Sequence, residues 1–144
     1  LRKEIATLRH SDRITMSGPF THADVDRLYT GIDFGICCCE LSEFSENAIA
    51  NKYFDYAACG RPFLFTAQGP MVRLMEHIRC GVAYRGGDPE AAAKGILQLV
   101  DADYPAMAAK GRQAIAQEYN WENDTARMLE FFERVLGKHQ LAGR

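Results

Sequence analysis

Residues 42–62 of this 144-residue chain read SEFSENAIANKYFDYAACGRP. The stretch lies between two apolar runs, 34–39 and 63–67, whose lengths are typical of buried strands. Ser45 suits the N-cap of a helix because its hydroxyl can accept a hydrogen bond from an early backbone N–H, and Gly60 suits the left-handed residue that ends one. The stretch therefore predicts a helix that connects two strands of a parallel sheet.

Polar side chains recur every four residues along this predicted helix, at Asn47, Asn51 and Asp55, so they should share one face. Lys52 flanks that face. A helix that begins beyond the carboxyl end of a buried strand can bind an anion through its first N–H groups, here near Ser45. Asp55 could accept hydrogen bonds from ribose hydroxyls, and Lys52 could meet a phosphate. A plain solvated helix face remains the alternative.

Length and composition bound the class of protein. The chain is long enough for one domain with a hydrophobic core, and 47% of its residues are hydrophobic, as in ordinary globular proteins. A net charge of −2 gives no electrostatic reason to expect a nucleic acid or an acidic membrane as partner. The five cysteines, three of them consecutive at 37–39, lack zinc-ligand spacing, and we expect buried thiols in the reducing cytosol.

Hydrophobic periodicity indicates the secondary structure of the rest of the chain. Strands alternate with helices, which predicts an α/β domain with a Rossmann-like parallel sheet of about four strands, flanked by helices and followed by long C-terminal helices. Asp88 and Pro89 mark a helix start, and Asn120 suits the cap of the last helix. The predicted strands cover 13–18, 32–39, 63–67 and 80–85, and the predicted helices cover 1–9, 22–30, 45–59, 71–79, 91–100, 104–118 and 121–136.

Other candidate motifs are weaker. Gly18 ends the first predicted strand, where a glycine either lets a ligand approach the backbone or simply turns the chain. Three glutamates, Glu40, Glu43 and Glu46, precede the central helix, where carboxylates either complement the helix dipole or belong to a site. The glycine-rich dinucleotide and P-loop motifs and the G-x-S-x-G elbow are absent, and the histidines lack metal-ligand spacing. A dinucleotide oxidoreductase or a hydrolase therefore has little support.

Residues 51–64, NKYFDYAACGRPFL, resemble the donor-site helix of retaining GT-B glycosyltransferases of family 4, the glycosyl transferases group 1. The segments LYTGID at 28–33 and EYNW at 118–121 also resemble segments of that family, so the resemblance covers nearly the whole chain. It implies a single domain over 1–144, the nucleotide-sugar-binding C-terminal part of a GT-B enzyme. The implied reaction transfers a hexose-type sugar to a glycan or lipid-linked acceptor, as in polysaccharide biosynthesis.

The resemblance also implies roles for particular residues. Asp55 takes the place of the glutamate that binds ribose in the family, and Asn47 takes the place of the preceding acid, with Glu46 beside it. Asn47 and Glu46 are thus the expected catalytic residues near the donor sugar. No cofactor and no metal are expected, because the nucleoside diphosphate sugar is itself the substrate. The residues expected to bind the donor nucleotide and its phosphates are Asp55, Lys52, Asn51, Ser45 and Gly18.

Parts of the family's pattern have no counterpart in this sequence, namely the acceptor-binding half and the two strands that open the donor domain. We therefore expect a C-terminal piece of a longer cytoplasmic enzyme, peripheral at the inner face of the membrane, that lacks transferase activity alone and pairs exposed strand edges with another chain. Asn47, which lacks the charge of an acid, favours a second hypothesis, a non-enzymatic α/β interaction or regulatory domain. A sugar-nucleotide epimerase is a third, without a carboxylate–histidine arrangement to support it.

Overall fold

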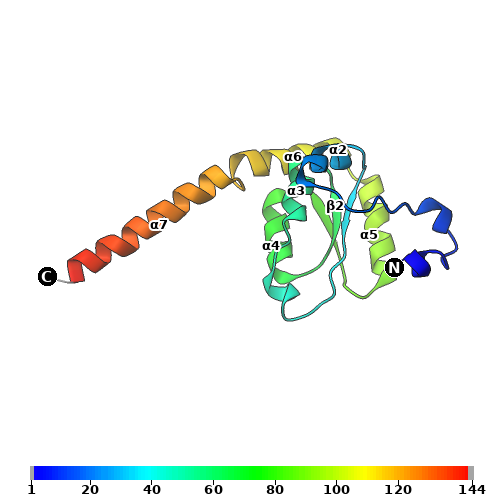
Figure 1. Ribbon diagram of the computed structural model, residues 1–144, viewed down its shortest axis with the longest axis horizontal. Coiled ribbons are helices and arrows are strands. Elements are labelled where there is room, and N and C mark those ends of the chain that lie inside the picture. Colours follow the sequence, from blue (N-terminus) through cyan, green and yellow to red (C-terminus); the bar gives the residue numbers. More distant parts are fainter. Residues whose placement is uncertain (1, 143–144) are drawn as a thin grey trace.

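Three parallel strands form the sheet in the computed structural model, which describes residues 2–142 (Figure 1). They are β1 (Gly35–Cys37), β2 (Phe63–Thr66) and β3 (Gly81–Tyr84), and they lie in the order β1-β2-β3. Both pairings are parallel, and the chain crosses between the strands through helices. This arrangement confirms the predicted α/β class with a Rossmann-like parallel sheet.

Helices connect the strands. After β3, the described chain is helical apart from short turns. The first helix is shorter than predicted and the last is longer. The helical segments are α1 (Arg2–Ile5), η1 (Ser11–Arg13), η2 (His22–Asp24), α2 (Val25–Thr30), η3 (Ser45–Asn47), α3 (Lys52–Ala58), α4 (Gly69–Ile78), α5 (Pro89–Asp101), α6 (Tyr104–Gln117) and α7 (Trp121–Ala142).

β2 is the centre of the core, because all four of its residues are buried. Phe63 and Phe65 pack on the face of the sheet that α3 and α4 cover, and Leu64 packs on the opposite face with residues of α5. Figure 1 shows α4 and α5 on opposite sides of the sheet. Full burial of one such side chain stabilises a fold by about 2 kcal/mol. The packing of α3 on Phe63 and Phe65 therefore holds this helix against the sheet.

Three of the predicted helix ends are confirmed, at Asp88, Asn120 and Gly60. Asp88 Oδ1 accepts a hydrogen bond of 2.9 Å from Ala91 N at the start of α5. Asn120 Oδ1 accepts one of 2.9 Å from Asn123 N at the start of α7. Gly60 has a φ of 61° beyond the end of α3, in the left-handed region that favours glycine.

The strand predicted for 13–18 is wrong. Arg13 ends η1, and the residues that follow have no regular secondary structure as far as Thr21. The side chains of Ile14 and Met16 are exposed. A strand exists only where a neighbour bonds to its N–H and C=O groups, and in the described residues no strand lies beside this segment. The sheet consequently has three strands rather than about four, and β1 is an edge strand.

The continuous helix predicted for 45–59 is also wrong. Ser45 is buried inside the short η3, Ala48 is extended with φ −119° and ψ 145°, and α3 begins only at Lys52. The side-chain amide of Asn47 donates to Glu43 O at 2.9 Å, so it bonds the backbone of an earlier residue. Such local bonds compete with helix formation. Asn47, Asn51 and Asp55 therefore do not lie along one helix face.

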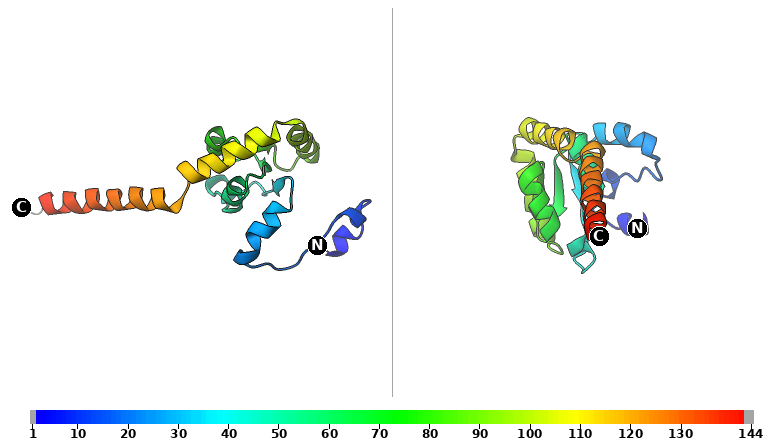
Figure 2. Two further views of the ribbon diagram at one scale, coloured as in Figure 1. Left: turned by 90° about the horizontal axis from the view of Figure 1, so that it is seen from above. Right: turned by 90° about the vertical axis from the view of Figure 1, so that its left-hand side faces the viewer.

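α7 projects away from the α/β body, and Figure 2 shows it leaving the end of α6 as a separate arm. Several large apolar side chains of this helix are exposed, among them Met128, Leu129, Phe132 and Leu136. Among residues 2–142, no helix combines the length and the apolar character that a membrane crossing requires.

Candidate functional site

A cavity of about 670 Å³ opens between α2, α3 and the segment that precedes η2. Its wall is largely apolar, and the charged groups on it are Lys52 and Asp55. Gly18 adjoins this wall in the sequence, next to Ser17, and has a φ of 81°. The cavity thus gathers two of the predicted site residues and borders a third. It is lined by Ser17, Phe20, Thr21, Val25, Leu28, Tyr29, Ile32, Lys52, Asp55 and Tyr56.

α3 presents its cavity-lining residues through ordinary helical spacing. Lys52, Asp55 and Tyr56 lie three and four residues apart, so they share one face. The adjoining face carries Tyr53 and Ala57, both buried in the core. The amphipathic pattern of α3 therefore fixes the direction in which the Asp55 carboxylate and the Lys52 ammonium group point.

Two tyrosines form an aromatic part of the cavity wall. The rings of Tyr29 and Tyr56 meet edge to face with 5.0 Å between their centroids, and the Tyr56 ring also packs on Phe63 at 5.7 Å. Burial raises the pKa of both tyrosines, and the Asp55 carboxylate contributes to the rise in the pKa of Tyr29. Both side chains are therefore neutral phenols at neutral pH, and they give the cavity an aromatic surface that a planar ring could contact.

Sequence reasoning missed this tyrosine pair as part of a site. The signal was present in Tyr56, which follows Lys52 by four residues and must share its helix face. Tyr29 lies on a different helix, and no local pattern connects it with Tyr56. Only the packing of α2 against α3 brings the two rings together.

Ser45 belongs to a self-contained loop outside this cavity. Ser42 N donates to Ser45 Oγ at 2.9 Å, and Ser45 N donates to Ser42 Oγ at 3.2 Å. The N–H groups of Glu46, Asn47 and Ala48 donate to backbone oxygens of the same loop. The backbone donors predicted to meet phosphate are thus already bonded within the loop in this conformation.

The remaining predicted residues are exposed in that loop or shortly after it. Glu46 and Asn47 are exposed in η3, away from the lining of the cavity. Asn51 is exposed at the N-cap position of α3, and its side chain makes no capping hydrogen bond. Their predicted roles toward a donor sugar and its phosphates stay predictions.

A smaller cavity of about 290 Å³ lies at the carboxyl ends of β1 and β2. Cys39, Ser45, Tyr53 and Gln68 contribute to its wall. The side-chain Nε2 of Gln68 is buried without a hydrogen-bond partner. Ligands of open parallel sheets bind at this edge, so this cavity adjoins the expected ligand position.

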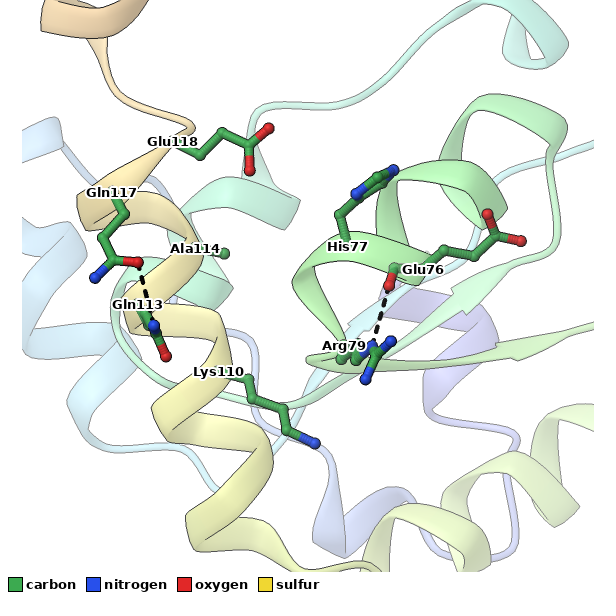
Figure 3. A pocket seen from close by; sticks show the side chains of 8 residues that line it. All are labelled: Glu76, His77, Arg79, Lys110, Gln113, Ala114, Gln117 and Glu118. Carbon is green, nitrogen blue, oxygen red and sulfur yellow. Dashed lines mark hydrogen bonds between the residues drawn. The ribbon is translucent and has the colours of Figure 1, made fainter.

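A third cavity, of about 410 Å³, lies between α4 and α6 and is drawn in Figure 3. Arg79 Nε donates to Glu76 O at 3.1 Å, and Gln113 Nε2 donates to Gln117 Oε1 at 3.1 Å. None of the residues predicted for a site lines it. In the described part of the chain, no three His, Cys, Asp or Glu side chains are grouped so that they could hold a metal ion.

Comparison with known proteins gives one family and one curated relative. The family model described as glycosyl transferases group 1 matches residues 1–102. The D-inositol 3-phosphate glycosyltransferase of Salinispora tropica is 27% identical over 136 residues, which cover 94% of this chain and 27% of that protein. The chain thus spans about a quarter of the length of this relative. No solved structure matches.

Proposed function

This chain belongs to the glycosyl transferases group 1 family, and from that premise we propose that it is the donor-binding portion of a retaining GT-B enzyme of family 4. The enzyme transfers a hexose-type sugar from a nucleoside diphosphate to a glycan or lipid-linked acceptor. It acts in the cytoplasm, and a lipid-linked acceptor brings it to the inner face of the membrane. The donor is a substrate, and no metal is required.

The observation that carries this proposal is the shared position of Asp55, Lys52 and the two tyrosines on one cavity wall. The Asp55 carboxylate accepts hydrogen bonds from the ribose hydroxyls, and charge-assisted bonds of this kind are the strong ones. Lys52, one helical turn earlier, attracts the diphosphate. The aromatic and aliphatic wall contacts the base, and the Gly18 backbone is open to it because nothing lies within 4 Å of a Cβ position there.

Glu46 and Asn47 are proposed to approach the donor sugar, and Asn51 and Ser45 to approach its phosphates. The loop 42–48 must exchange some of its internal hydrogen bonds for bonds to phosphate when the donor binds. A loop with its backbone near the surface and little regular structure is suited to such a rearrangement.

Calorimetric titration of the chain with UDP, GDP and ADP tests the proposal. We expect one nucleotide to bind, and Asp55→Ala to weaken that binding about tenfold or more. Asp101→Ala, which removes an exposed carboxylate at the end of α5, is the matched control and should bind like the wild type. Absence of binding by all three nucleotides would overturn the proposal.

A non-enzymatic α/β interaction or regulatory domain is the second candidate. The internally bonded loop 42–48 and the amide of Asn47 in place of an acid favour it. A longer protein that contains this chain then binds no nucleoside diphosphate and transfers no sugar. Measured sugar transfer by such a protein, lost on Asp55→Ala, excludes this candidate.

A further inference from the structure

Two thiols approach each other at the end of β1, outside the lining of the cavity between α2 and α3. Cys37 Sγ and Cys39 Sγ are 3.9 Å apart, because alternate residues of an extended segment point to the same side. Tyr53 Oη lies 3.8 Å from Cys39 Sγ. Cys38, between them, points the other way and is exposed. Neither thiol of the pair has a role in the proposed reaction.

Both cysteines are held by backbone and side-chain bonds. Cys37 pairs with Phe65 in the register of the sheet. Cys39 N donates to Thr66 Oγ1 at 3.0 Å, which fixes the chain where it leaves the strand. The pair is thus preorganised, and little backbone ordering remains for a ligand that bridges the two sulfurs.

The pair is also within reach of solvent on one side. Cys37 is buried, but Cys39 is only half-buried and lines two cavities, one of about 290 Å³ and one of about 470 Å³. The smaller cavity also carries Gln68, whose buried Nε2 has no hydrogen-bond partner. An ion that enters either cavity meets Cys39 first.

We propose that Cys37 and Cys39 form a two-sulfur site for a soft monovalent cation, Cu(I). Thiolates select soft ions, and Cu(I) accepts two ligands. Zinc needs four ligands, and among residues 2–142 no third His, Cys, Asp or Glu joins the pair. Zinc–thiolate bonds are about 2.3 Å long. Copper–thiolate bonds of similar length would span the observed sulfur–sulfur distance of 3.9 Å in a bent S–Cu–S arrangement.

Binding forms two copper–sulfur bonds and releases the two thiol protons to solvent, with no change in oxidation state. The bridged unit carries one net negative charge. The Tyr53 hydroxyl is placed to donate to the Cys39 thiolate and to orient it, as outer partners of metal ligands commonly do.

Anaerobic titration of the chain with Cu(I) held by a coloured chelator tests the site. We expect the chain to take one Cu(I) from the chelator, and Cys37→Ser or Cys39→Ser to weaken uptake at least tenfold. Cys38→Ser and Cys59→Ser are the matched controls and should take up Cu(I) as the wild type does. X-ray absorption of the loaded chain should show two sulfur neighbours.

Several outcomes overturn the site. They are no uptake by the wild type, equal uptake after Cys37→Ser and Cys39→Ser, and a coordination shell without two sulfurs. Circular dichroism confirms that each variant folds, and Cys39→Ala serves if Cys37→Ser does not fold, because Cys39 is less buried. Nucleotide titration of Cys39→Ala should give wild-type affinity, so failure of the copper site and failure of the proposed function are separate results.

Discussion

The ring of Tyr56 lies directly against Gly35. A Cβ atom built on Gly35 would come 2.6 Å from two carbon atoms of that ring, closer than real Cβ atoms approach a neighbour. Gly35 opens β1 and Tyr56 belongs to α3, so this contact sets the distance between the sheet and the helix that carries Asp55.

Gly35→Ala should therefore lower the free energy of unfolding by about 1–3 kcal/mol, because the added methyl group must displace a packed ring. Urea denaturation followed by circular dichroism measures the change. Gly31→Ala is the control, since its nearest neighbours are 3.6 Å away and its backbone is not left-handed. Equal midpoints for Gly35→Ala and the wild type contradict this reading of the contact.

Arg61 connects α2 to the body. Its Nη2 donates to Thr30 O and its Nη1 donates to Tyr104 Oη, both at 2.8 Å. Arg61→Met keeps the apolar length of the side chain but removes both bonds, so we expect a loss of about 1.5–3 kcal/mol in unfolding free energy. Because α2 carries Tyr29, nucleotide affinity should fall as well.

The control for this variant is Arg85→Met, which changes an exposed arginine beyond β3. It should leave both the unfolding midpoint and nucleotide affinity near their wild-type values. If Arg61→Met and Arg85→Met have the same unfolding midpoint in urea, the two hydrogen bonds of Arg61 contribute nothing measurable to the free energy of unfolding.

Burial raises the pKa of the Cys80 thiol to about 12. Between the ordinary cysteine pKa and that value, the unfolded chain has lost the proton while the folded chain retains it. Stability contributed by this group is therefore complete below the ordinary pKa and declines as the pH rises above about 9. Urea midpoints measured between pH 8 and about pH 11 should fall.

Cys80→Ala should flatten this decline while lowering stability at neutral pH, because the smaller side chain leaves a void in the core. A wild-type decline with the same slope as that of Cys80→Ala would assign the alkaline sensitivity to other groups. Mass spectrometry after brief alkylation gives a second measurement, in which exposed Cys38 reacts before buried Cys80.

The cap of α5 gives a smaller effect. Asp88 Oδ1 accepts from Ala91 N at 2.9 Å, and the carboxylate also favours the positive end of the helix dipole. Asp88→Ala should lower the free energy of unfolding by about 1 kcal/mol. Asp101→Ala, at the other end of the same helix, should instead be neutral or slightly stabilising.

Sequence reasoning found the elements that local chemistry determines. Asp88, Asn120 and Gly60 act through their own side chains or backbone angles, and these predictions are confirmed. It also found the runs that became β2 and β3, although only β2 is buried at every position.

It failed where a distant segment of the chain, or a competing local hydrogen bond, decides the structure. Residues 13–18 have the composition of a strand but no neighbouring strand, so their pattern alone misled. The regular spacing of Asn47, Asn51 and Asp55 suggested one helix, yet the bonds between Ser42 and Ser45 and from Asn47 to Glu43 O stabilise a separate turn. The cavity wall of Tyr29 and Tyr56 depends on two helices packing together, which no local window contains.

Because the large apolar side chains of α7 are exposed, we expect this helix to melt separately from the α/β body. A helix of about 20 residues without a packed face is marginal in water, whereas the body has a buried core around β2. Heating should first remove helical circular dichroism from α7 and only later unfold the sheet. A binder that covers Met128, Phe132 and Leu136 would stabilise α7 and merge the two thermal transitions into one. The number of transitions in a calorimetric scan therefore tests whether a partner binds that helix.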